Sequence, residues 1–103
     1  MAHALVWSDA AASDLHAIAA YIALDNPSAA STVVRSVLAK LDSVADFPHG
    51  HRVVPEFGIP ILREIVMAPY RIVYWVDDET ESITILRIWH SSRGVPEVEL
   101  PTD

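Results

Sequence analysis

The amino-acid sequence predicts an α+β fold with the element order β-α-α-β-β-β, in which a twisted antiparallel sheet packs against an antiparallel two-helix hairpin. Apolar residues recur at helical spacing through the first half of the chain, and runs of β-branched and aromatic residues fill the second half. With 103 residues, the chain has the length of one domain. We expect this domain to span residues 1–93 and residues 94–103 to form an extended or mobile C-terminal tail.

The first half of the chain predicts a short strand followed by two helices. Residues 3–8 form the expected strand, and Ser8 or Asp9 can cap the first helix with a side-chain oxygen. The second helix begins at Asn26 and Pro27, a cap followed by a proline at the first helical position, where the missing N–H costs nothing. The apolar stripes are Leu15, Ile18, Ala19 and Ile22 in the first helix, and Ala30, Val34, Val37, Leu38, Leu41 and Val44 in the second.

After a break at residues 47–50, the second half predicts strands joined by short loops, which are antiparallel neighbours. The expected strands are 61–67, 70–77 and 83–90, and residues 52–57 are a candidate for a further short strand before them. Pro55 limits this candidate to a sheet edge. Strand 70–77 is apolar on both faces apart from Arg71, so both faces need a cover. The helical hairpin covers one face, and a partner protein is the expected cover of the other, so we expect the isolated chain to self-associate.

The composition limits the classes of function. The net charge is −7, with seven Lys+Arg against fourteen Asp+Glu, which opposes nucleic-acid binding through a uniform surface. There is no cysteine, and no segment resembles a signal peptide or a membrane span, so we expect a cytoplasmic protein without membrane contact. His49 and His51 with Asp46 have the residue types of a zinc site, but a solvated loop is the favoured interpretation, and we expect no metal and no cofactor.

Three segments carry a resemblance to a known family: VWSDAAASDLHAIAAYIALDNPSAA, RVVPEFGIPILREIV and YRIVYWVDDETESITILRIWHSSR. In this order, from about Val6 to Arg93, they resemble the RelE/ParE superfamily of toxins from type II toxin–antitoxin systems, and are closer to its ParE-like branch. The resemblance implies a growth-arresting toxin that a cognate antitoxin neutralises in a hetero-oligomeric complex. RelE-like members cleave mRNA on the ribosome, whereas ParE-like members inhibit DNA gyrase without known catalytic residues of their own.

The resemblance to RelE-like nucleases implies four catalytic candidates. Metal-independent RNA cleavage needs a base, cations for the phosphate and an acid for the leaving oxygen. Glu56 matches the base, Arg63 and Arg71 match the phosphate-binding cations, and His90 matches the acid. The alternative is that the arginines pair with Glu56, Glu64 and the acidic loop, and that His90 only ends its strand. If the chain binds a partner protein, the candidate contacts are Arg63, Arg71, Trp75, Arg87 and Arg93.

Three functions therefore compete at this point. Inhibition of DNA gyrase by protein binding is favoured over ribosome-dependent mRNA cleavage, because the chain is acidic and Lys40 is its only lysine. The segment Ser91-Ser92-Arg93 also stands where the most RelE-like enzymes have an aromatic residue after the histidine. The third function is a non-toxic module that only binds its antitoxin.

Overall fold

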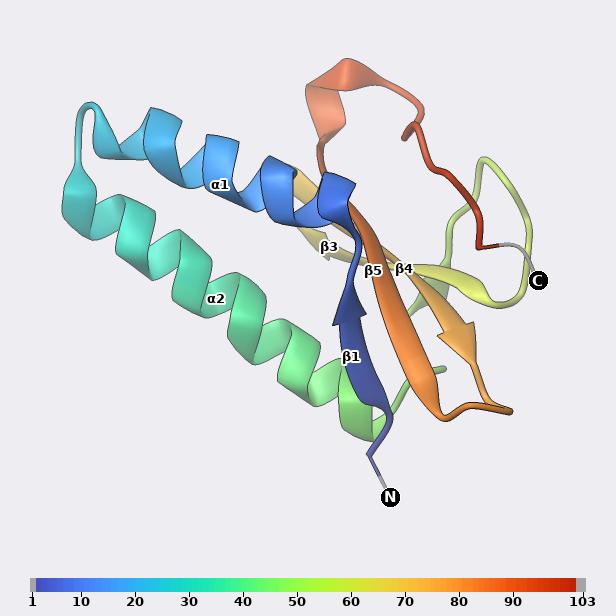
Figure 1. The fold of residues 1–103 in the computed structure, drawn as a ribbon. Helices are drawn as coiled ribbons and strands as arrows, with labels where there is room; N and C mark the ends of the chain where they lie inside the picture. Colours follow the sequence, from blue (N-terminus) through green and yellow to red (C-terminus); the bar gives the residue numbers. More distant parts are fainter. Residues whose placement is uncertain (1, 102–103) are drawn as a thin grey trace.

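The computed structural model describes residues 2–101 and confirms the α+β class, with two helices packed on one face of a five-stranded sheet (Figure 1). The elements are β1 (Ala4–Trp7), α1 (Asp9–Ala23), α2 (Pro27–Asp46), β2 (Arg52–Val53), β3 (Leu62–Met67), β4 (Tyr70–Asp77), β5 (Ser82–His90) and a short 3-10 helix (Ser91–Arg93). No helix within residues 2–101 is long and apolar enough to cross a membrane.

The helix boundaries follow the predicted caps. The Ser8 side chain accepts a hydrogen bond from the Ala11 amide at 3.1 Å, and the Asn26 side chain accepts one from the Ala29 amide at 3.1 Å. Each cap satisfies one of the backbone N–H groups that a helix leaves unpaired at its start. With only Leu24, Asp25 and Asn26 between them, α1 and α2 form the expected hairpin.

The strand order is β1-β5-β4-β3-β2. The strands β2 to β5 pair antiparallel with one another, as predicted from their short loops. In contrast, β1 pairs in parallel with β5, so the sheet is mixed. A parallel neighbour requires a long crossover, and the two helices provide part of the connection that brings the chain back beside β1.

The segment 52–57 was a candidate for a strand, but only Arg52 and Val53 pair with β3. Beyond them the chain turns, and the amides of Phe57 and Gly58 both donate to the Val54 carbonyl at 3.1 Å. Gly58 has a φ of 64°, which favours glycine. Pro55 has no N–H for a sheet ladder, which explains why pairing ends where it does.

The two faces of the sheet carry separate apolar clusters. On the helix side, Val37, Leu41 and Val44 of α2 and Ala11 of α1 pack against buried residues of β3, β4 and β5. On the opposite face, which we call the open face, the buried cluster is Val54, Leu62, Val73 and Leu86. Val98 and Leu100 pack against this second cluster, and Figure 1 shows the C-terminal segment running beside the loop that precedes β3. The chain's own residues thus cover part of the face for which the sequence predicted a partner.

Candidate functional site

A network of four charged side chains lies on the open face. Arg71 of β4 donates through both terminal nitrogens to Glu56, at 2.6 and 2.7 Å, and through Nε to Glu64 at 2.6 Å. Arg52 donates to the other oxygen of Glu64, also at 2.6 Å. Strand register explains the arrangement, because Arg52 lies opposite Glu64 in the β2–β3 pair and the turn after β2 brings Glu56 to Arg71. We call these four residues the charge network.

The charge network favours the ionised form of Glu56 and pairs the buried Glu64 with two arginines. The Glu64 side chain has no exposed surface, and burial of an ionised group is tolerated only with such partners. The hydrogen bonds from Arg71 lower the pKa of Glu56 to about 2, with burial acting in the opposite direction. The hydrogen bonds to Glu56 and Glu64 raise the pKa of Arg71. At neutral pH Glu56 is therefore a carboxylate with both oxygens engaged by one guanidinium.

Arg63 points to the other face of the sheet. It lies opposite Tyr74, a helix-side core residue, whereas its neighbours Leu62 and Glu64 face the open side. Its Nε donates to the Pro60 carbonyl at 2.8 Å. Its Nη1 donates to two carbonyls of the loop before β2, those of His49 at 3.1 Å and His51 at 2.8 Å. Arg63 thus connects this loop to β3, a structural contact made through the backbone.

His90 lies at the end of β5, also on the helix side. It is opposite Tyr70 in the β4–β5 pair, and the two rings meet edge to face with centroids 5.4 Å apart. Its Nδ1 accepts a hydrogen bond from the Ser92 amide at 3.1 Å and so caps the 3-10 helix. Of the four catalytic candidates, the structure brings only Glu56 and Arg71 into contact, while Arg63 and His90 lie on the opposite face.

Of the remaining partner-binding candidates, Arg87 and Arg93 stack on Trp89, and Trp75 lies elsewhere. Arg87 makes a bidentate contact with Asp14 of α1, at 2.7 and 2.9 Å, which raises the pKa of Arg87. The guanidinium groups of Arg87 and Arg93 lie over the Trp89 ring, 4.9 and 3.9 Å from its centroid. Trp75 is half-buried and packs against the second apolar cluster. Pairing of arginines with Glu56 and Glu64 was predicted from the sequence, whereas the Arg87–Asp14 contact and the stack on Trp89 were not. Asp14 and Arg87 are far apart in sequence, and Arg93 is brought onto Trp89 by the 3-10 helix after β5.

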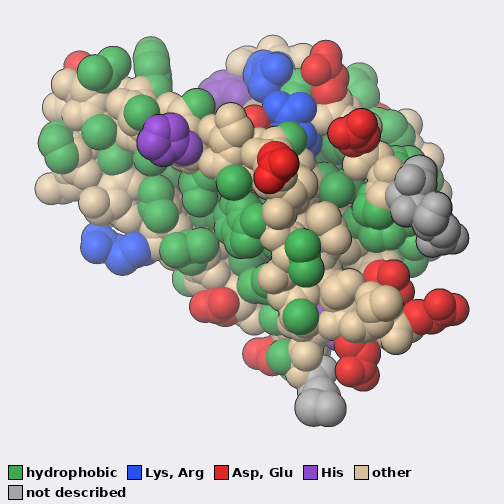
Figure 2. All heavy atoms as spheres, in the orientation of Figure 1, with side chains coloured by type: hydrophobic (Ala, Val, Ile, Leu, Met, Phe, Trp, Pro, Cys, Tyr) green, Lys and Arg blue, Asp and Glu red, His purple; other side chains and the backbone are tan. Residues whose placement is uncertain are grey.

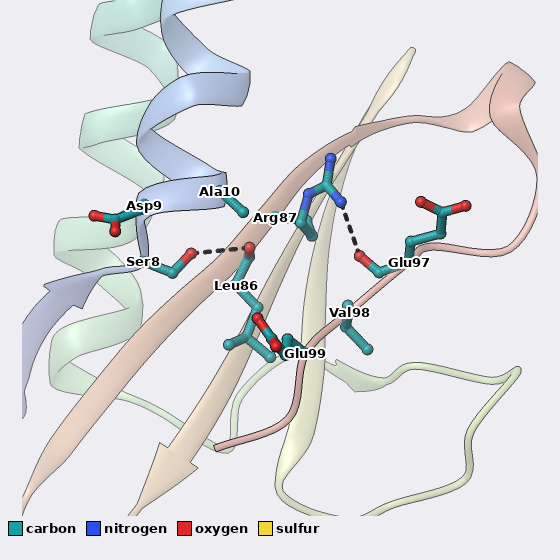
Figure 3. Close-up of a pocket in the computed structure, with 8 residues that line it drawn as sticks. All are labelled: Ser8, Asp9, Ala10, Leu86, Arg87, Glu97, Val98 and Glu99. Atoms are coloured by element: carbon teal, nitrogen blue, oxygen red, sulfur yellow. Dashed lines mark hydrogen bonds between the residues drawn. The ribbon is translucent and has the colours of Figure 1, made fainter. Parts of the chain in front are cut away.

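A cavity of about 400 Å³ separates the start of α1 from the tail residues Glu97 to Glu99 (Figure 3). Two of its polar side chains are engaged with backbone carbonyls: the Ser8 hydroxyl donates to the Leu86 carbonyl at 3.0 Å, and Arg87 donates to the Glu97 carbonyl at 3.0 Å. The eight residues that line the cavity include no histidine that would activate the serine hydroxyl. The cavity therefore has no set of residues for nucleophilic catalysis.

The histidines of the loop before β2 do not meet one another. His49 contacts Asp78 in the β4–β5 turn, with 2.9 Å between Nε2 and Oδ2. The second oxygen of Asp78 lies 2.9 Å from Nε2 of His3, and these two hydrogen bonds lower the pKa of Asp78. Within residues 2–101, no group of three or more His, Cys, Asp or Glu side chains is arranged to hold a metal ion.

The fold and the resemblance of its sequence place the chain in a class, the small toxins of type II toxin–antitoxin systems. Residues 5–95 match the family model described as the ParE toxin of type II toxin-antitoxin system, parDE. This match covers most of the chain. The chain therefore belongs to the ParE toxin family and is the toxin component of a type II toxin–antitoxin system.

Two curated relatives span nearly the same length. Toxin RelE2 of Caulobacter vibrioides is 36% identical over 90 residues, which cover 86% of this chain and 96% of that protein. The protein Y4kP of Sinorhizobium fredii, which is named as a toxin, is 33% identical over 94 residues, covering 89% of this chain and 92% of its own. Both names refer to toxins; one carries the name RelE, and the other names no branch.

Two solved structures share the fold. The chromosomal ParDE system from P. aeruginosa superposes with a TM-score of 0.68 at 25% identity, covering 85% of this chain and 95% of that chain. The RelBE2 toxin–antitoxin complex from Mycobacterium tuberculosis gives 0.60 at 20% identity, covering 87% and 99%, a likeness of fold alone.

Proposed function

We propose that this toxin arrests growth by ParE-like inhibition of DNA gyrase, through protein binding and without catalytic chemistry of its own. The observation that carries the proposal is the bidentate Glu56–Arg71 pair. A general base needs a free lone pair near the proton that it removes, and a pKa near the working pH. Glu56 does not meet the second condition, because the hydrogen bonds from Arg71 to its two oxygens lower the pKa of Glu56 to about 2.

The distribution of charge supports the same proposal. Of the six arginines, Arg52, Arg71 and Arg87 form ion pairs, and Arg63 donates to backbone carbonyls. Figure 2 shows Lys and Arg in two separate places on the face that it presents, with Asp and Glu spread between and beyond them. A toxin that docks into ribosomal RNA needs a continuous cationic surface, because binding to phosphates depends on their neutralisation by Lys and Arg.

A cognate antitoxin is the expected partner, since the family and the ParDE neighbour are both toxin–antitoxin systems. We propose the cytoplasm as the location, where gyrase, ribosomes and antitoxin are all present. No cofactor is part of the proposed mechanism.

The test is pulse-labelling of DNA and protein synthesis in the first minutes after the chain is induced without an antitoxin. We expect DNA synthesis to fall first, and purified gyrase to be inhibited by the chain. Glu56→Gln and His90→Phe should retain growth arrest if the variants remain folded. If protein synthesis falls first and either substitution abolishes this effect, ribosome-dependent mRNA cleavage would replace the proposal. If the chain causes no growth arrest, the third function, a non-toxic module that only binds its antitoxin, would replace it.

A further inference from the structure

A second groove lies between α1, the start of β4 and the end of β5. Its volume is about 310 Å³. The floor is apolar, with Ile18 and Ile88 among its residues, and the rim carries Tyr21, Tyr70, His90 and Arg93. Tyr21 is 76% exposed, so a large aromatic ring stands at the entrance with little contact to the rest of the chain. We call this feature the donor groove.

The rim of the donor groove presents hydrogen-bond donors. Because Nδ1 of His90 accepts from the Ser92 amide, the neutral ring carries its proton on Nε2, which is left as a donor. Arg93 forms no ion pair within residues 2–101, and its stacking on Trp89 uses the face of the guanidinium and leaves the N–H groups at its edge. Tyr21 and Tyr70, whose hydroxyl groups can donate, also line the groove.

The one carboxylate that lines the groove has its oxygens in use. Asp14 receives two hydrogen bonds from Arg87, at 2.7 and 2.9 Å, and a third from the Ile88 amide at 3.0 Å. The groove therefore combines an apolar floor with a rim of donors and one cation that lacks a carboxylate partner among the described residues. Such a surface complements a ligand with a single carboxylate beside a large apolar group.

We infer that the donor groove binds a segment of a partner protein in which an acidic side chain lies next to a large apolar one. The carboxylate pairs with Arg93 and accepts from Nε2 of His90, and the apolar side chain packs against Tyr21 and Ile18. A single unpaired arginine suits one carboxylate, and the net charge of −7 opposes the approach of a polyanion such as RNA. This inference does not depend on whether the toxin acts on gyrase.

The test uses the full chain and the peptide acetyl-Ala-Phe-Ala-Glu-Ala-amide, in which alternate side chains lie on one side of an extended backbone. Amide resonances of Tyr21, His90 and Arg93, and the Trp89 indole resonance, are followed by NMR during titration. We expect shifts confined to these groups, and about tenfold weaker binding when glutamine replaces glutamate in the peptide. Arg93→Gln should weaken binding by a similar factor.

Arg35→Gln is the matched control, because Arg35 is exposed on α2 and lines a different groove. It makes the same change of charge and should leave peptide binding unchanged. Tyr21→Ala, at an exposed position, should also weaken binding without loss of folding. Absence of shifts at millimolar peptide, or equal loss of binding in the Arg93 and Arg35 variants, would overturn the inference. Hexauridylate that moves the same resonances at lower concentration would also overturn it, by making the groove a nucleic-acid site.

Discussion

At the scale of single residues, the charge network depends on the hydrogen-bond partners of one buried carboxylate. Glu64 has a fully buried side chain, and its two oxygens are divided between Arg71 and the more exposed Arg52. Arg71 in turn holds Glu56 at the surface end of the charge network. Such a chain of charges stabilises a unique arrangement only while each buried member keeps its partner.

Removing Arg71 alone should therefore destabilise the protein more than removing both Arg71 and Glu64. We expect Arg71→Leu to lower the free energy of unfolding by about 3–5 kcal/mol, because it leaves Glu64 buried with one partner fewer. Arg71→Leu with Glu64→Leu should recover most of this loss. Arg52→Leu also removes a partner of Glu64, but the Arg52 side chain is 55% exposed, so we expect a smaller loss than for Arg71→Leu. Urea unfolding measures all three, and a double variant as unstable as the single one would contradict the argument.

The Glu56–Arg71 pair should also appear in the dependence of stability on pH. The pKa of Glu56 falls from 4.5 to about 2 on folding, so its ionised form is stabilised in the native state. This contribution is fully present above about pH 4.5 and is lost as the pH falls through about 2. We expect the difference in unfolding free energy between the wild type and Glu56→Gln to be constant from pH 7 to about 5 and to shrink below. If the difference in unfolding free energy stayed independent of pH down to 2, the Glu56–Arg71 pair would not control the titration of Glu56.

At the scale of elements, the C-terminal segment acts as the cover of the open face. Val98 and Leu100 pack against the cluster of Val54, Leu62, Val73 and Leu86, and Arg87 holds the Glu97 carbonyl. Gly94, with a φ of 80°, redirects the chain after the 3-10 helix, and its carbonyl accepts a hydrogen bond from Trp89. Side chains thus attach this segment, although it has no regular secondary structure.

Truncation of these side chains should therefore destabilise the domain. We expect Val98→Ala with Leu100→Ala to lower the free energy of unfolding by about 1–3 kcal/mol, less than full burial would give because both positions are half-buried. Val95→Ala, at a position that is 57% exposed, should change it by less than about 0.5 kcal/mol. Thermal or urea unfolding distinguishes the two variants, and equal stability would mean that the segment does not cover the face in solution.

At the scale of the whole molecule, the C-terminal segment over the open face changes what we expect for self-association. Self-association was expected because one face of β4 had no evident cover. The C-terminal segment supplies part of that cover. The large apolar side chains that stay exposed are spread over strands, helices and loops: Val6, Tyr21, Leu24, Leu38, Phe47, Phe57, Val66 and Val95. Scattered exposed apolar residues are ordinary on a monomer.

We therefore expect a monomer at micromolar concentration, to be measured by sedimentation velocity. The variant Val98→Asp with Leu100→Asp should instead associate or bind an apolar dye, because it removes the cover from Leu62 and Val73. Val95→Asp is the matched control at an exposed position and should remain monomeric. A wild-type chain that associates as strongly as the doubly substituted one would restore the original expectation.

The sequence by itself determined the elements and the family. The caps at Ser8 and Asn26, the helical spacing of apolar residues and the β-branched runs are local signals, so the order of helices and strands could be predicted from neighbouring residues. Only the tertiary structure decided the parallel pairing of β1 with β5, the contact of Asp14 with Arg87 and the separation of His90 from Glu56. Each of these joins, or keeps apart, residues distant in sequence. Their positions depend on strand register and on which face each side chain occupies, and the packing of the complete chain fixes both.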